Sequence, residues 1–87
     1  MLRITRTDRE GTTTLLLEGR LTRRERTALD EACADCIADR GAVVIDLAGI
    51  GFVDAAGAAA LRAWRERRVE LTGCSPYVRE LLQGELV

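Results

Sequence analysis

The chain has 87 residues, a length that supports one domain with a modest hydrophobic core, and we expect residues 1–87 to form that single domain. Thirteen basic residues, all of them arginine, nearly balance fourteen acidic ones, so no basic field exists that would hold a nucleic acid. The chain has no His, no Lys and one Ser, which excludes Ser–His, Cys–His and Schiff-base catalysis and predicts a protein that is not an enzyme.

The first segment is predicted to be a β-hairpin. Residues 2–5 alternate apolar and polar side chains, as in a half-buried edge strand, and residues 8–11 have the composition of a turn. Residues 12–19 then return as a second strand, made more central by three consecutive leucines. The short connection favours antiparallel pairing of the two strands.

The next segment is predicted to be an amphipathic helix over residues 23–40. Thr22 and Glu25 have the spacing of a capping box, which marks the helix start, and Gly41 is typical of a helix end. The apolar positions recur at helical spacing and form one stripe for packing on a sheet: Leu29, Ala32, Cys33, Cys36 and Ile37. Cys33 and Cys36 belong to this stripe, so we expect them to be packed and metal-free, because no further Cys pair or His completes a zinc site.

The stretch from Val43 to Trp64 organises the rest of the chain. Residues 43–47 are a near-continuous apolar run, which predicts a parallel strand covered on both faces. Gly49 and Gly51 predict a loop after that strand. Asp54 is placed to cap the following helix, which begins at Ala55 and is rich in small residues.

The last segment is predicted to be a strand followed by a helix. Residues 67–72 form the strand, and Ser75 and Pro76 mark the helix start. The apolar face of that helix is expected to contain Tyr77, Val78, Leu81 and Leu82. The fold class is therefore α/β, with element order β-β-α-β-α-β-α and a mixed four-stranded sheet that has an antiparallel edge strand.

Residues 46–57 read D-L-A-G-I-G-F-V-D-A-A-G. A strand ending in D-L, a short hydrophobic segment and D-x-x-G opening a small-residue helix resembles the STAS domain of anti-anti-sigma factors and sulfate-transporter tails. The flanking hairpin, the first helix and the segment L-T-G-C-S-P at residues 71–76 follow the same order. The resemblance implies a STAS-like fold over most of the chain.

The resemblance also implies a function. STAS domains of this kind are anti-sigma factor antagonists, regulatory modules that bind a protein partner of the anti-sigma factor or serine-kinase type. The implied partner-binding residues are Phe52, Val53, Asp54, Ala55, Ala56, Gly57, Ala58 and Ala59. In the family, a kinase phosphorylates a serine directly before the motif glycine, and Ala56 stands there, a degenerate phosphosite. No Ser, Thr or Tyr occurs between Ala28 and Leu71, so we expect no phosphorylation switch at this position.

Other functions remain open at this stage. Small STAS subunits bind the ATPase of ABC-type lipid transport complexes, and some STAS domains sense nucleotides, although no glycine-rich phosphate loop followed by Lys is present. Asp46 and Asp54 could share Mg²⁺ in an enzyme, but their expected roles are to bind loop amides and to cap a helix. We expect no cofactor and no metal, and a homodimer is a further option.

No signal peptide, lipidation signal or apolar run long enough to cross a membrane is evident, so a cytoplasmic location is expected.

Overall fold

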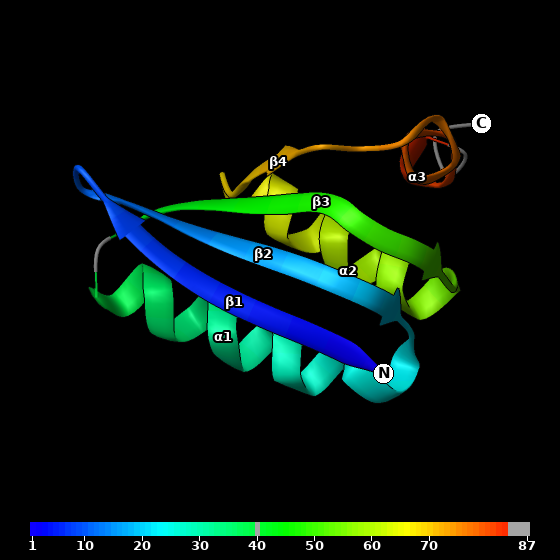
Figure 1. Cartoon of the computed structure of the whole chain (residues 1–87), viewed down its shortest axis with the longest axis horizontal. Coiled ribbons are helices and arrows are strands. Elements are labelled where there is room, and N and C mark those ends of the chain that lie inside the picture. Colours follow the sequence, from blue (N-terminus) through cyan, green and yellow to red (C-terminus); the bar gives the residue numbers. More distant parts are fainter. Residues whose placement is uncertain (40, 84–87) are drawn as a thin grey trace.

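The computed structural model describes residues 1–39 and 41–83, and its elements follow the predicted order. In sequence they are β1 (Leu2–Arg9), β2 (Thr12–Leu21), the 3₁₀ turn η1 (Arg23–Glu25), α1 (Arg26–Asp39), β3 (Ala42–Val53), α2 (Ala55–Glu66), β4 (Glu70–Thr72) and α3 (Pro76–Gln83). The four strands form one sheet, and Figure 1 shows the helices beside it.

The sheet is mixed and has the order β1-β2-β3-β4. β1 and β2 pair in antiparallel fashion, whereas β2 with β3 and β3 with β4 are parallel. The hairpin turn between β1 and β2 contains Glu10 and Gly11, with φ values of 52° and 82°. Two positive φ values in a row are typical of a type I′ turn, whose twist matches that of the paired strands. The predicted hairpin and its position at the sheet edge are confirmed.

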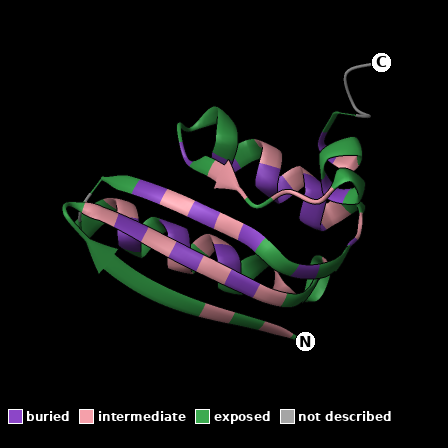
Figure 2. Ribbon diagram, turned by 45° about the horizontal axis from the view of Figure 1, so that its top comes forward, coloured by how far each residue is buried: buried purple, intermediate pink, exposed green. Residues whose placement is uncertain are grey.

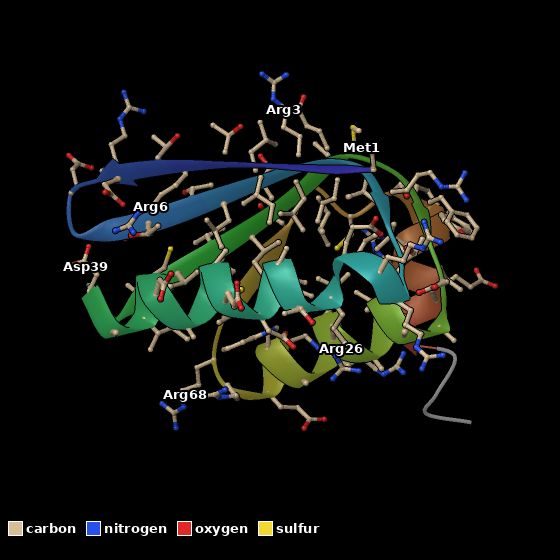
Figure 3. The ribbon with its side chains drawn as sticks, turned by 90° about the horizontal axis from the view of Figure 1, so that it is seen from below. Met1, Arg3, Arg6, Arg26, Asp39 and Arg68 are labelled. Carbon is tan, nitrogen blue, oxygen red and sulfur yellow. The ribbon has the colours of Figure 1, made fainter. Side chains whose placement is uncertain are left out.

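One face of the sheet is covered and the other is open. α1 and α2 lie on the same side of the sheet (Figure 3). The side chains that face them are buried: Leu15, Leu17, Val43, Ile45 and Leu47. Side chains that alternate with these, such as Leu16 and Val44, are only half-buried (Figure 2).

The prediction that the central strand is covered on both faces is therefore wrong. The two crossovers, β2-α1-β3 and β3-α2-β4, advance across the sheet in the same direction. Because both are right-handed, they place their helices on one face. The apolar run over residues 43–47 gave no indication that both helices lie on one face, because that arrangement depends on the order of the strands in the sheet.

The apolar stripe of α1 is confirmed. Leu29, Cys33 and Cys36 are buried, and Ala32 and Ile37 pack against the same core. The helix start differs slightly from the prediction, because residues 23–25 form a 3₁₀ turn before the α-helix begins. In the predicted capping box, the Glu25 carboxylate accepts from the Thr22 amide at 3.0 Å. The predicted end at Arg40 lies outside the described residues.

β3 continues through the segment that was predicted to be a loop. It runs for 12 residues to Val53, and residues 49–53 pair with the end of β2. β3 has an extra residue between Asp46 and Gly49 and another between Ile50 and Phe52, so it bulges twice. A Cβ at Gly49 would lie 3.0 Å from the Leu17 carbonyl oxygen, which shows why glycine suits the first bulge. The glycines thus mark bulges rather than a loop.

The last helix starts as predicted but presents a smaller apolar face. The Ser75 hydroxyl accepts from the Val78 amide at 3.2 Å, which confirms the N-cap. Val78 and Leu82 are buried and Leu81 is half-buried. Tyr77, expected on the apolar face, is instead 45% exposed, and its hydroxyl is bound to the backbone at the end of β3.

Candidate functional site

Asp54 connects the beginnings of two helices. Its carboxylate accepts from the Gly57 amide in the first turn of α2 at 2.8 Å and from the Arg23 amide of η1 at 3.0 Å. These two bonds, with that from Gly57 the stronger influence, lower the pKa of the Asp54 carboxyl below its ordinary value. The predicted capping role is confirmed. The bond from the Arg23 amide, which joins Asp54 to η1 as well, was not indicated by the sequence.

Gly57 allows α2 to approach the end of β2. A Cβ at this position would lie 2.4 Å from the carbonyl oxygen of Leu21, a distance that no side chain can adopt. The same carbonyl accepts from the Asp54 amide at 3.2 Å. The motif glycine is therefore required for packing of the helix start against the strand end.

Ala56 lies in the first turn of α2, between the capping Asp54 and the buried Gly57, and is half-buried. Its side chain is a methyl group, so it has no hydroxyl that a kinase could modify. The adjacent helix start is also occupied, because the Asp54 carboxylate already accepts from the Gly57 amide there. The side chains of residues 54–59 at the start of α2 are small, and Asp54 is the charged residue among them.

Large apolar side chains are exposed beside this helix start. Apart from Met1, the exposed large hydrophobic residues of the described chain are Phe52 and Tyr77. The guanidinium of Arg20 lies 4.5 Å from the centre of the Phe52 ring, a cation–π contact. The Tyr77 hydroxyl donates to the Val53 carbonyl at 3.2 Å, which fixes the start of α3 against the end of β3.

The predicted partner-binding residues divide by burial. Phe52 and Ala55 are exposed, and Asp54, Ala56 and Ala59 are half-buried, whereas Val53, Gly57 and Ala58 lie in the core. We use the term docking surface for the accessible residues together with the two side chains that adjoin Phe52 and Val53: Arg20, Phe52, Asp54, Ala55, Ala56, Ala59 and Tyr77.

Sequence reasoning missed Arg20 and Tyr77. Arg20 pairs with Phe52 only because of the bulges in β3, and the register that they create cannot be read from the sequence. Tyr77 lies in the first turn of α3, four residues before Leu81, so helical spacing placed it on the apolar face and gave no sign of its exposure.

Asp46 and Asp54 do not form a common site. The Asp46 carboxylate accepts from the Ala48 amide at 2.9 Å, as expected for a residue that binds nearby backbone. Because the intervening residues are extended strand, the two carboxylates are separated by on the order of 20 Å. Within residues 1–39 and 41–83, no group of three or more His, Cys, Asp or Glu side chains could hold a metal ion.

The remaining cysteines and Trp64 have structural environments. Burial raises the pKa of the Cys33 thiol to about 12, and it also raises that of Cys36. Cys74 is half-buried in the turn before α3. The Trp64 indole packs in the core and donates to Asp30 at 2.7 Å, which joins α2 to α1.

A mixed four-stranded sheet with both crossover helices on one face, and a helix capped by Asp at the end of its third strand, defines a STAS domain. The chain belongs to the STAS family described as "Mlab, STAS domain", whose model matches residues 4–84. A search of curated proteins found no match.

Solved structures show the same fold at low sequence identity. The anti-sigma factor antagonist SpoIIAA in its unphosphorylated form has a TM-score of 0.69 at 17% identity, over 95% of this chain and 82% of that one. An anti-sigma factor antagonist STAS domain from Rhodobacter sphaeroides has a TM-score of 0.57 at 20% identity, over 83% and 86%. Mglu has a TM-score of 0.62 at 21% identity, over 83% of this chain and 19% of that one.

The chain is thus a STAS domain that resembles anti-sigma factor antagonists in fold. None of the described helices has the length and apolar character that a membrane span requires.

Proposed function

We propose that this STAS domain is a non-enzymatic regulatory module that binds a protein partner through the docking surface. The observation that carries the proposal is the position of Phe52 and Tyr77. These two side chains, 37% and 45% exposed, lie at the end of β3 beside the start of α2. Exposed aromatic residues around a small, mostly uncharged centre are typical of protein interfaces.

The module is not switched by phosphorylation at Ala56. In the domains that it resembles, a phosphoserine before the motif glycine would place a dianion at a helix start, where it opposes docking of a partner. Ala56 has no hydroxyl, so the docking surface stays in the form that binds. The protein would therefore behave as a permanently dephosphorylated antagonist. It would act in the cytoplasm whenever its partner is present there.

Two partner classes are candidates. The similarity to SpoIIAA and to the Rhodobacter sphaeroides domain supports an anti-sigma factor of the serine-kinase type. The matched family is described by Mlab rather than by an anti-sigma antagonist, which supports testing the transporter ATPase as well. Both classes would use the same docking surface, so variants of that surface apply to either.

Ala56→Glu is the variant that tests the docking surface. A carboxylate in the first turn of α2 suits the helix dipole, so the fold should persist and the melting temperature should change little. Docking would bury that charge without a partner, and affinity should fall about tenfold or more. Titration calorimetry with a purified anti-sigma factor and with a transporter ATPase measures both affinities.

Two further variants complete the experiment. Ala28→Glu places a carboxylate in the first turn of α1 at an exposed position and should leave affinity unchanged. Ala56→Ser should bind nearly as well as the natural protein, and it should become phosphorylated only by a partner that is a kinase. If Ala56→Glu binds as tightly as the natural protein, the interface lies elsewhere and the proposal is wrong.

A further inference from the structure

The strand β4 has a neighbour on one side only. The sheet order places it after β3, and no strand pairs with its outer edge within the described part of the chain. Figure 1 shows β4 as the border of the sheet opposite β1. The N–H and C=O groups along an unpaired strand edge can pair with a strand from another chain.

A hollow lies along this edge. Its volume is about 470 Å³, and it is bordered by β4 and the Gly73–Cys74 turn, by Arg65 of α2 and by Arg79 and Leu82 of α3. Leu71 of β4 lines the hollow and is half-buried, so part of the accessible lining is apolar. The volume falls within the range of sites that hold a ligand or a short peptide segment.

Two arginines at the hollow have no acidic partner among residues 1–39 and 41–83. Arg65 and Arg79 are both exposed, and neither guanidinium forms an ion pair or a side-chain hydrogen bond among the residues described. Glu70 is the one acidic side chain among the described residues of the lining, which also contains both arginines. The charge of the hollow is therefore complementary to an acidic group.

The opposite edge of the sheet differs in these respects. β1 carries Arg3, Arg6 and Arg9 along eight residues, and Arg6 is already bound to Asp39 at 2.6 Å (Figure 3). Charged side chains along an edge strand oppose pairing with other strands. β4 carries a single charge, on Glu70, and has a hollow beside it.

We propose that the outer edge of β4 binds an extended, acidic peptide segment of a partner protein. The segment would lie beside Glu70–Thr72 as a fifth strand, with its backbone bound to the free edge. A carboxylate of the segment would lie between Arg65 and Arg79, and an apolar side chain would contact the half-buried Leu71. This site is separate from the docking surface and does not depend on the proposed function.

The expected affinity is low, because β4 offers only three residues for pairing. A dissociation constant of about 0.1–1 mM is reasonable for an isolated peptide of this kind. Such a contact would matter in a partner that is held elsewhere as well, because linkage of two weak contacts raises overall affinity.

Nuclear magnetic resonance titration of the ¹⁵N-labelled full chain tests the proposal. The probe is an acetylated and amidated peptide of about seven residues with the sequence TVEVTVT, a length typical of a strand. The amides of Glu70, Leu71 and Thr72 should shift on titration. Two forms of the probe, N-methylated on opposite sets of alternate residues, should behave differently, because only one set of N–H groups faces β4.

Variants at the arginines test the charge requirement. Arg65→Gln and Arg79→Gln should each weaken binding about two- to fivefold, the effect of an exposed ion pair. Arg68→Gln, an exposed arginine outside the hollow, is the matched control and should bind as the natural protein does. A probe with Lys in place of Glu should bind more weakly than the acidic probe.

Several results would overturn the proposal. Equal binding of both N-methylated probes would exclude strand pairing, and an absence of shifts at β4 up to several times the expected dissociation constant would exclude the site. Complete competition by inorganic phosphate would show that the hollow takes small anions. Shifts of the β4 amides on concentrating the protein alone would show that a second copy of the chain occupies the edge.

Discussion

Asp54 is the residue on which the candidate site depends most. One carboxylate binds the amides of Gly57 and Arg23, so it fixes α2 and η1 relative to each other. The sequence could predict half of this arrangement, because an Asp before a run of helix-forming residues is a recognisable N-cap. The Arg23 contact could not be predicted, since 31 residues separate the two partners.

Asp54→Ala should lower the melting temperature, whereas Asp54→Asn should retain most of the stability because the amide oxygen still accepts hydrogen bonds. The folded chain lowers the pKa of this carboxyl, so its stabilising effect is present above the ordinary Asp pKa and is lost as the pH falls through the lowered value. The stability advantage over Asp54→Asn should therefore be full at neutral pH, shrink as the pH falls below the ordinary Asp pKa and vanish below the lowered pKa. Urea unfolding across this range measures it, and an advantage that grows with acidity would contradict the capping role.

Gly57 illustrates a constraint that only the structure quantifies. Gly57→Ala should destabilise the fold by about 1–3 kcal/mol, since the new Cβ would overlap the Leu21 carbonyl and push α2 away from β2. Gly11→Ala is an informative comparison, because no atom lies within 4 Å of a Cβ there and only the positive φ opposes the change. If Gly57→Ala were as stable as the natural chain by calorimetry, the close approach would have no energetic weight.

The three cysteines should differ in reactivity. Burial of Cys33 and Cys36 keeps their thiols protonated, with a pKa of about 12 for Cys33, so neither is a nucleophile near neutral pH. Iodoacetamide should modify the half-buried Cys74 first, and the other two only after unfolding. Mass spectrometry of peptides from native and denatured samples gives the order. Equal modification of all three in the native protein would show that the α1 stripe opens readily.

At the scale of elements, the sequence predicted which segments are strands and helices but not where β3 ends. Gly49 and Gly51 resemble loop residues, and local composition cannot distinguish a loop from a bulged strand. The distinction comes from pairing with β2, which lies more than 25 residues earlier in the chain. The extension matters for the site, because it carries Phe52 to the end of β3, where the side chain contacts Arg20 and lies close to the start of α2.

The Tyr77 hydroxyl holds α3 to the sheet, so removing that one oxygen atom removes the contact. The Tyr77 hydroxyl accepts from the Val53 amide at 3.5 Å and donates to the Val53 carbonyl at 3.2 Å. Tyr77→Phe should cost about 0.5–1.5 kcal/mol and should act on α3 more than on the strands. Hydrogen exchange should become faster at residues 76–83 while β2 stays protected. Uniform acceleration over the whole chain would instead show that α3 opens only on global unfolding.

At the scale of the whole molecule, the fold is a two-layer structure with an open sheet face. The helices bury every second side chain of the central strands, and the alternate side chains reach solvent (Figure 2). The element order was predictable from apolar periodicity and turn residues. The covering of a single face was not predictable, because the three consecutive leucines of β2 are equally apolar although they point to both faces of the sheet.

Those leucines provide a direct test of the layering. Leu15 and Leu17 face the helices and are almost fully buried, whereas Leu16, between them, lies on the open face and is half-buried. Leu17→Ala should destabilise the protein by about 2–5 kcal/mol, because it leaves a cavity in the core. Leu16→Ala should cost about 1 kcal/mol or less, because its side chain keeps part of its hydration when folded.

The measurement is the unfolding free energy of both variants in urea, with Leu15→Ala as a second buried comparison. A difference of at least about 1 kcal/mol between the buried and open positions is expected. The m-values should be alike if the denatured state is unchanged. If Leu16→Ala were as damaging as Leu17→Ala at low protein concentration, the second face would have to be covered within the monomer. If that were true only at high concentration, a second copy would cover it, and the affinity of self-association would then set the apparent stability.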